Sequence, residues 1–228
     1  MTTRLQQTRY LELMGITVWR ERAATTDTGI DTTPATPAPV VEGVDLDQLE
    51  RQVAACTACA LHRGRTRTVF GVGNRKPRWM IIGEAPGADE DRQGEPFVGR
   101  AGGLLNSMLL AAGFARDDVY IANIVKCRPS GNRNPQPDEI SSCSRYLNRQ
   151  IELLQPSLIL AVGRVAAHAL LKTELPLGKL RGRLHRYEPA GIPLVVTYHP
   201  AYLLRKPGDK ARVWEDLKYA LSLSGVVQ

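Results

Sequence analysis

The sequence has no long apolar run and few cysteines, and both shortages narrow the class of protein. No stretch approaches the roughly 18 consecutive apolar residues of a membrane-spanning helix, which excludes a membrane-spanning protein. The first 15 residues lack the continuous apolar core of a secretory signal, so we expect a cytoplasmic protein. In that compartment the four cysteines are expected to be metal ligands or thiols rather than disulfides.

Composition and charge narrow the class further. Apolar residues make up 43% and charged residues 23% of the chain, which excludes collagen-like, coiled-coil and wholly disordered proteins. The net charge of +7 is uneven: residues 1–45 hold four basic and six acidic side chains, and the remainder hold 26 and 17. The positive charge therefore belongs to the folded part. It suits a polyanionic partner such as nucleic acid, or a basic surface that serves solubility, and charge alone does not decide between them.

Three segments differ in composition. Residues 1–22 show apolar residues at roughly helical spacing, so we expect a short amphipathic segment that packs on the protein or on a partner. Residues 23–44 are rich in Thr, Pro and Ala and are expected to form a flexible linker. Residues 45–228 form the folded domain.

The folded domain alternates between short apolar runs and amphipathic stretches. We expect four strands, at residues 78–84, 118–125, 157–163 and 192–200. We expect one helix with Asp45 as its N-cap and two helices that span residues 101–114 and 137–156. A fourth helix is expected after residue 163 and a last one near the C-terminus. This order predicts a three-layer α/β/α fold with a central, four-stranded, mostly parallel sheet. Ligands of such sheets bind outside the carboxyl ends of the strands, where loops 84–103, 126–137 and 198–207 are expected.

The four cysteines form a pattern. Cys56 and Cys59 make a C-x-x-C pair, and 15 residues separate Cys127 from Cys143. Four thiolates can hold either zinc or an iron–sulfur cluster, and the spacing alone does not choose between these groups. Four unrelated buried cysteines are the plainer alternative.

Three loops at the expected carboxyl edge carry unusual residues. The loop that runs from Gly83 to Gly102 is rich in glycine and acidic residues and has no G-K-[ST], which argues against a nucleotide phosphate loop. Within it, Phe97 either stacks on a ligand or folds back onto the core. Asn123 ends a strand and can read a polar ring edge, or it forms a turn. His199 opens the segment HPAYLLR, where it serves a nucleic-acid site or the fold.

Together the motifs GEAPG-x-x-ED-x-x-G-x-PFVGRAG, NIVKCRP and HPAYLL, with the cysteine spacing, resemble the family 4 uracil-DNA glycosylases, the iron–sulfur branch of that superfamily. The resemblance implies a [4Fe–4S] cluster on Cys56, Cys59, Cys127 and Cys143. It implies a monomeric, monofunctional enzyme that flips uracil out of single- or double-stranded DNA. The enzyme would hydrolyse the N-glycosidic bond and leave an abasic site.

The resemblance also assigns roles within the pocket. Phe97 would stack on the base, Asn123 would bind its Watson–Crick edge, and Glu90 would crowd the C5 position. His199 would stabilise the departing uracil and Glu84 would hold the attacking water. Ala85 and Gly87 would contribute to substrate binding from the same loop.

Further residues would contact the DNA. A wedge into the gap left by the flipped base would consist of Leu203, Leu204 and Arg205. Phosphate contacts would come from Arg100, Lys126, Arg128 and Arg133.

Two other hypotheses remain open from the sequence. The chain could be a non-catalytic nucleic-acid-binding module with a structural metal site, which would keep the cysteines and the basic surface. Separately, residues 1–43 could tether the protein to a repair or replication partner.

Overall fold

The core of the fold is a twisted sheet whose strands carry buried apolar residues on both faces. In the computed structural model, which describes residues 43–224, this sheet has six strands in the order β1-β3-β2-β4-β6-β5. The strands are β1 (Val72–Gly73), β2 (Trp79–Gly83), β3 (Tyr120–Asn123), β4 (Leu158–Val162), β5 (His185–Tyr187) and β6 (Ile192–Thr197). The four inner strands are parallel, and β1 and β5 pair antiparallel at the edges.

The α/β fold class is therefore confirmed, and the expected number of four strands is corrected to six. The four expected strands are the parallel inner ones. The two additional strands, β1 and β5, have only two and three residues, too few to show an apolar alternation.

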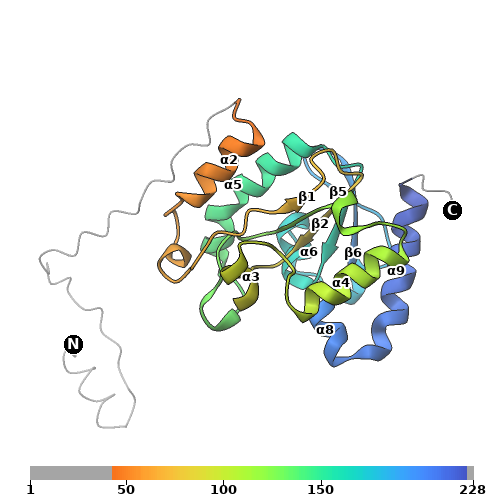
Figure 1. Ribbon diagram of the computed structural model, residues 1–228. Helices are drawn as coiled ribbons and strands as arrows, with labels where there is room; N and C mark the ends of the chain where they lie inside the picture. The colour runs from red at the N-terminus through yellow and green to blue at the C-terminus, as the bar shows by residue number, and fades with distance from the viewer. Residues whose placement is uncertain (1–42, 225–228) are drawn as a thin grey trace, which may run out of the picture. The chain divides into compact units, whose positions relative to one another are not determined.

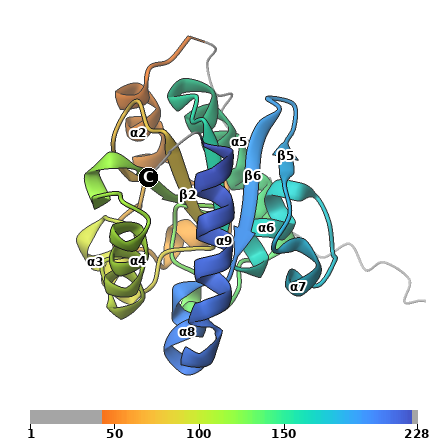
Figure 2. The same cartoon turned by 90° about the vertical axis from the view of Figure 1, so that its right-hand side faces the viewer.

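Successive side chains of a strand point to opposite faces of the sheet, and different helices pack against each face. Met80 and Ile82 point into a core shared with α2, α5 and α6, while Trp79 and Ile81 point into a core shared with α4 and α9. Figure 2 shows α9 in front of the sheet and α5 behind it. The main helices are α2 (Leu46–Ala54), α4 (Arg100–Ala111), α5 (Pro137–Leu154), α6 (Arg164–Leu171) and α9 (Lys210–Leu223).

Local sequence signals explain where the helices begin. The Asp45 side chain caps α2 by accepting from Gln48 N at 2.8 Å, and Asp45 N donates to the Gln48 side chain in return. Pro137 occupies the first turn of α5, where its missing N–H costs nothing. Figure 1 shows α2 and α5 side by side at one end of the sheet.

Short helices and 3₁₀ turns lie in the connections. Those that follow β2, β3 and β6 are α3 (Ala88–Gln93), the 3₁₀ turn η3 (Ser130–Asn132) and α8 (Pro200–Arg205); the others are α7 (Leu177–Leu180) and the 3₁₀ turns η1 (Ala60–Arg63), η2 (Arg116–Asp118) and η4 (Pro207–Asp209). Because the chain runs from β2 to β3 on one side and then crosses to β4 on the other, the sheet has a switch point between β2 and β4. Such points form ligand crevices at the carboxyl edge.

The expected segment 1–22 and residues 23–42 of the expected linker 23–44 lie outside the described residues. No helix within residues 43–224 is long and apolar enough to cross a membrane.

Candidate active site

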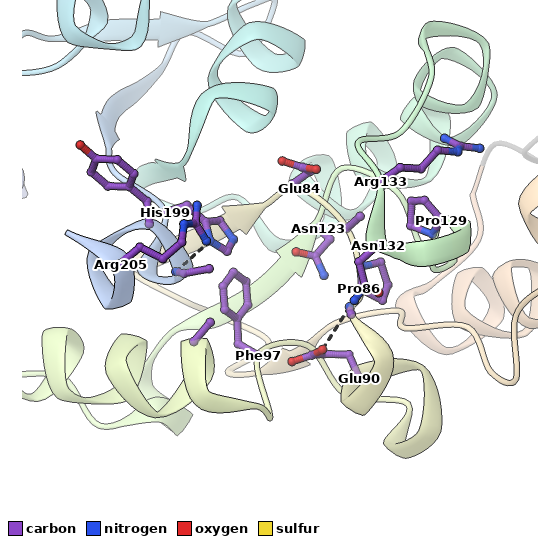
Figure 3. Close-up of a pocket in the computed structure, with 15 residues that line it drawn as sticks. Glu84, Pro86, Glu90, Phe97, Asn123, Pro129, Asn132, Arg133, His199 and Arg205 are labelled. Atoms are coloured by element: carbon purple, nitrogen blue, oxygen red, sulfur yellow. Dashed lines mark hydrogen bonds between the residues drawn. The ribbon is translucent and has the colours of Figure 1, made fainter. Parts of the chain in front are cut away.

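A pocket of about 490 Å³ opens at the carboxyl edge of the sheet, above the ends of β2, β3 and β6. Figure 3 shows the ring of Phe97, the amide of Asn123 and the imidazole of His199 gathered around this space. The full lining consists of Glu84, Ala85, Pro86, Gly87, Glu90, Phe97, Ala101, Asn123, Pro129, Asn132, Arg133, His199, Ala201, Tyr202 and Arg205.

Asn123 is the last residue of β3 and is only 1% exposed. Its Oδ1 atom is buried and has no hydrogen-bond partner among the described residues. Buried polar atoms are usually paired, because an unpaired acceptor costs about 1–3 kcal/mol. Asn123 also lines the pocket, so its amide lies where a bound ligand could pair with it.

Gly83 is the last residue of β2, and because it has no side chain, the side chains of Asn123 and Phe97 pack directly against it. A Cβ atom on Gly83 would lie 2.5 Å from Oδ1 of Asn123 and 2.6 Å from Cζ of Phe97. Neither distance is compatible with a carbon side chain. The absence of a side chain at Gly83 is therefore part of the shape of the site.

Phe97 is held in an unusual backbone conformation. Its φ angle is +54°, a region that costs a residue other than glycine about 1–3 kcal/mol. Arg116 fixes the loop from behind, with Nη2 donating to Pro96 O at 2.6 Å and Nη1 to Phe97 O at 3.4 Å. The loop thereby keeps the Phe97 ring at the pocket, 5.5 Å from the His199 ring centroid and 30° from its plane.

His199 caps the short helix α8. Its Nδ1 atom accepts a hydrogen bond from Ala201 N at 3.1 Å, and because a backbone N–H can only donate, the proton of the neutral ring is on Nε2. The pKa of His199 is lowered to about 4, chiefly because the surrounding protein desolvates the ring. The nearby charge of Arg205 lowers this pKa too, and Glu90 opposes the shift. At neutral pH the residue is an uncharged Nε2–H donor.

Glu84 follows β2 directly and lines the same pocket. Burial raises the pKa of its carboxyl group, and the charge of Arg164 partly offsets that effect. A carboxyl group with a raised pKa beside a substrate pocket is suited to holding a water molecule or exchanging a proton.

Two consecutive carboxylates of α3 bind different loops. Glu90 accepts from Gly87 N at 3.0 Å, from Val98 N at 3.0 Å and from Gly99 N at 3.1 Å, and so fixes the loop next to Phe97. Asp91, which is 3% exposed, accepts from Thr66 N at 2.9 Å, in the segment that follows η1. The short helix thus joins the pocket loop to the segment beside the cysteines.

The four cysteines line a second, smaller pocket on the α2 and α5 side of the sheet. N–H groups point at three of the sulfur atoms. Arg65 donates to Cys127 Sγ at 3.2 Å, Lys126 N to Cys143 Sγ at 3.3 Å, and Ala58 N to Cys56 Sγ at 3.5 Å. Such donors stabilise thiolates, the form that binds metals.

Burial shapes the acidity of these thiols. It raises the pKa of Cys143 to about 12, and raises the pKa values of Cys59 and Cys127 as well. Burial also acts on Cys56, but hydrogen bonds led by that of Tyr146 outweigh it and lower the pKa. Within residues 43–224, no three Cys, His, Asp or Glu side chains already lie close enough to hold one metal ion. The fit to a cofactor therefore rests on the shared pocket and its N–H donors.

Two expected DNA contacts are wrong. Lys126 is 1% exposed, and its ammonium donates to Asn123 O and to Gln150 Oε1 inside the protein, so it cannot reach a phosphate. Leu203 is fully buried in the core shared with α4 and α9, so it cannot form part of a wedge. Helix α8 turns Leu203 inward and leaves Leu204 38% exposed.

The other expected contacts are placed as follows. Arg133 and Arg205 line the pocket, with Arg133 also paired to Glu139 at 2.6 Å. Arg100 is exposed at the start of α4, and the half-buried Arg128 donates to Asn132 at 2.8 Å; neither lines the pocket.

Several residues of the site were not anticipated from the sequence. Tyr202 lines the pocket one helical turn after His199, a spacing that the HPAYLLR motif does contain. Arg116 donates to the backbone of Pro96 and Phe97, and Gln150 reaches Asn123 O through Lys126; neither Arg116 nor Gln150 belongs to a motif that could have pointed to it.

Comparisons with known proteins give the site a context. The sequence model of the family described as Uracil DNA glycosylase superfamily matches residues 70–218. The chain is 40% identical over 189 residues to a type-4 uracil-DNA glycosylase of Archaeoglobus fulgidus, covering 80% of this chain and 95% of that protein. It is 43% identical over 180 residues to the type-4 uracil-DNA glycosylase of Pyrobaculum aerophilum, covering 76% and 92%. For that of Thermotoga maritima, the identity is 42% over 180 residues, covering 78% and 93%.

Proposed function

The chain belongs to the type-4 uracil-DNA glycosylases and excises uracil from DNA by hydrolysing the N-glycosyl bond, and we propose that the pocket around Asn123 and His199 carries out this reaction. The observation that carries the proposal is the unpaired, buried Oδ1 of Asn123 in that pocket. No finding favours the non-catalytic binding module.

Asn123 accounts for selectivity. Uracil presents an N3–H donor beside an O4 acceptor, so the Asn123 amide can accept from N3–H through Oδ1 and donate to O4 through its NH₂ group. Cytosine presents the opposite polarity and would leave these buried groups unpaired. Sites built in this way can discriminate by about 10⁴-fold. Phe97 provides an apolar ring on which the flipped base stacks, and Glu90 is proposed to crowd the C5 position from its fixed place in the pocket wall.

The chemistry depends on leaving-group stabilisation. The bond between C1′ and N1 breaks, its electrons leave with uracil as an anion, and the sugar gains oxocarbenium character. The neutral His199 donates its Nε2–H toward O2, where the negative charge develops. Ala85 and Gly87 lie in the same pocket wall, and we propose that they bind the substrate there. Water held by Glu84 then adds to C1′, and the proton that this water loses ends on the uracil anion, so that the products are neutral uracil and the abasic sugar. A positioned donor of this kind is commonly worth about 10²–10³ in kcat.

DNA binding is proposed to use the basic residues around the pocket mouth. Arg133 and Arg205 line it, and the guanidinium groups of Arg100 and Arg128 are candidates for more distant phosphates. The exposed Leu204 is the candidate wedge, beside Arg205. Each neutralised phosphate would steepen the loss of affinity with salt.

We further propose that Cys56, Cys59, Cys127 and Cys143 hold a [4Fe–4S] cluster in the second pocket. Its part would be to cross-link α2, α5 and the loop after β3 rather than to transfer electrons. The proposal extends to a monomeric, cytoplasmic enzyme whose residues 1–43 bind a repair or replication protein.

The test is excision on a labelled oligonucleotide with one uracil, single-stranded or in duplex, followed by alkali to cleave abasic sites. Asn123→Ala and His199→Ala are compared with Asn134→Ala and His168→Ala, whose side chains lie outside the pocket. We expect about 10²-fold or greater loss for the first pair only. Full activity of either pocket variant would contradict its assigned role.

A further inference from the structure

Lys126 places a positive charge where the mechanism has no evident use for one. The residue is 1% exposed, and its Nζ donates to Asn123 O at 3.1 Å and to Gln150 Oε1 at 2.5 Å. Nζ also lies 6.0 Å from the ring centroid of Phe70. Among the described residues no carboxylate forms an ion pair with this ammonium. A buried charge is costly, so its retention calls for a reason.

The contact with Asn123 fixes the peptide unit that follows that residue. On one side, Ile124 N donates to Gly83 O at 2.9 Å, which ties the unit to β2. On the other side, the carbonyl of the same peptide accepts from Lys126. A peptide plane held at both ends cannot rotate, and this fixes ψ of Asn123 and with it the direction of the Cα–Cβ bond from which the amide projects.

Gln150 fixes the ammonium in turn. Its Nε2 donates to Phe70 O at 3.0 Å and to the Tyr120 hydroxyl at 3.2 Å, which leaves Oε1 free to accept from Lys126. Gln150 is fully buried in α5, the helix that also carries Cys143. The network therefore runs from the cysteine side of the sheet to the backbone beneath the pocket.

We propose that Lys126 is a positioning residue for Asn123, which sets the direction of the amide that reads uracil. The inference rests on the proposed function of Asn123. It also accounts for the NIVKCRP segment, where one residue donates its backbone N–H to Cys143 Sγ and its side chain to Asn123 O. Lys126 thereby links the cysteine pocket to the uracil pocket.

A double-mutant cycle tests the proposal. Lys126→Met keeps most of the side-chain volume and removes the donor, and it should lower kcat/KM on uracil-containing oligonucleotide by about 10- to 100-fold. Inhibition by free uracil should weaken by a similar factor, while affinity for DNA without uracil stays unchanged. In an Asn123→Ala background the further loss should be under about 2-fold, and in a His199→Ala background the full loss should persist.

Equal losses in both backgrounds, or full activity of Lys126→Met, would overturn the proposal. Full activity of Asn123→Ala alone would instead overturn the proposed function on which it rests. Gln150→Met provides a second variant if Lys126→Met does not fold. It leaves the residues beside the cysteines intact, and it should show the same dependence on background, with visible absorbance and melting temperature recorded to confirm a loaded, folded protein.

Discussion

Gly83 faces the amide of Asn123 so closely that a methyl group on Gly83 would lie 2.5 Å from Oδ1. The same methyl group would lie 2.6 Å from the ring of Phe97. The two groups proposed to read and stack the base are therefore packed against a position without a side chain. A side chain at position 83 should therefore displace both groups.

Gly83→Ala should displace Asn123 and Phe97 and lower kcat/KM by about 100-fold or more, because misplacement by about 1 Å can have that effect. The matched control is Gly103→Ala in α4, where a Cβ atom meets nothing within 4 Å. It should keep full activity and gain up to about 1 kcal/mol of stability. Excision kinetics and thermal melts check both variants, and a fully active Gly83→Ala would contradict the pocket geometry.

Leu203 and Leu204 are adjacent but should behave differently. Leu203→Ala removes a fully buried side chain and should cost about 2–5 kcal/mol of unfolding free energy. Leu204→Ala changes an exposed side chain and should alter stability by less than about 0.5 kcal/mol.

The activity of Leu204→Ala should fall more on duplex than on single-stranded substrate, since a wedge replaces a base only within a stack. Chemical denaturation and paired excision assays measure these effects. Equal activity losses on both substrates would argue against the wedge.

Acidic pH should affect activity through Glu84 before His199. The pKa of His199 is lowered to about 4, so the ring stays neutral as the pH falls through 6.5. Burial raises the pKa of Glu84, so its carboxylate is lost first as the pH falls. Glu84→Gln should lower the rate and flatten the acid limb of the pH profile.

The lowered pKa of His199 also affects the stability of the fold. An unfolded His199 has the ordinary pKa near 6.5, so the unfolded state binds more protons between about pH 6.5 and pH 4. The contribution of His199 to the free energy of unfolding is complete above about pH 6.5 and is lost as the pH falls from there to about 4. NMR titration of the four histidines checks the shift, and a His199 that titrates near 6.5 would refute it.

Removal of one cysteine should separate cofactor loss from a general packing effect. Cys143→Ala should abolish visible absorbance and iron content and lower the melting temperature by about 10 °C, because cofactor binding stabilises only the folded state. Ser141→Ala, an exposed change on the same helix, is the control and should leave colour and melting unchanged. A Cys143→Ala protein that keeps its iron and colour would contradict the ligand set.

Sequence patterns predicted the inner sheet well because its strands are apolar runs flanked by helices. The helix at Arg164–Leu171 follows its strand without an intervening loop, and both were expected at these places. The site could be anticipated because Glu84, Asn123 and His199 each lie at or just after the end of an inner strand, and parallel strands bring their carboxyl ends to one edge.

Side-chain direction could not be predicted in the same way. Lys126 and Leu203 lie in motifs that suggest DNA contact, yet both point inward. A lysine is normally exposed, and the exception is explained by two buried acceptors, Asn123 O and Oε1 of Gln150, of which the second lies 24 residues away in the chain. Leu203 and Leu204 differ by one position on a six-residue helix, too short a stretch for a periodic pattern to separate them.

Helix α3 has a consequence for motion. Glu90 and Asp91 are neighbours in the chain, but one holds the amides of Val98 and Gly99 and the other holds the amide of Thr66. Unwinding of α3 would release both loops in one event. Their backbone amides should share one opening free energy and exchange with solvent together. Opening of the loop that carries Phe97 should then be accompanied by opening of the segment that follows η1, beside the cysteines.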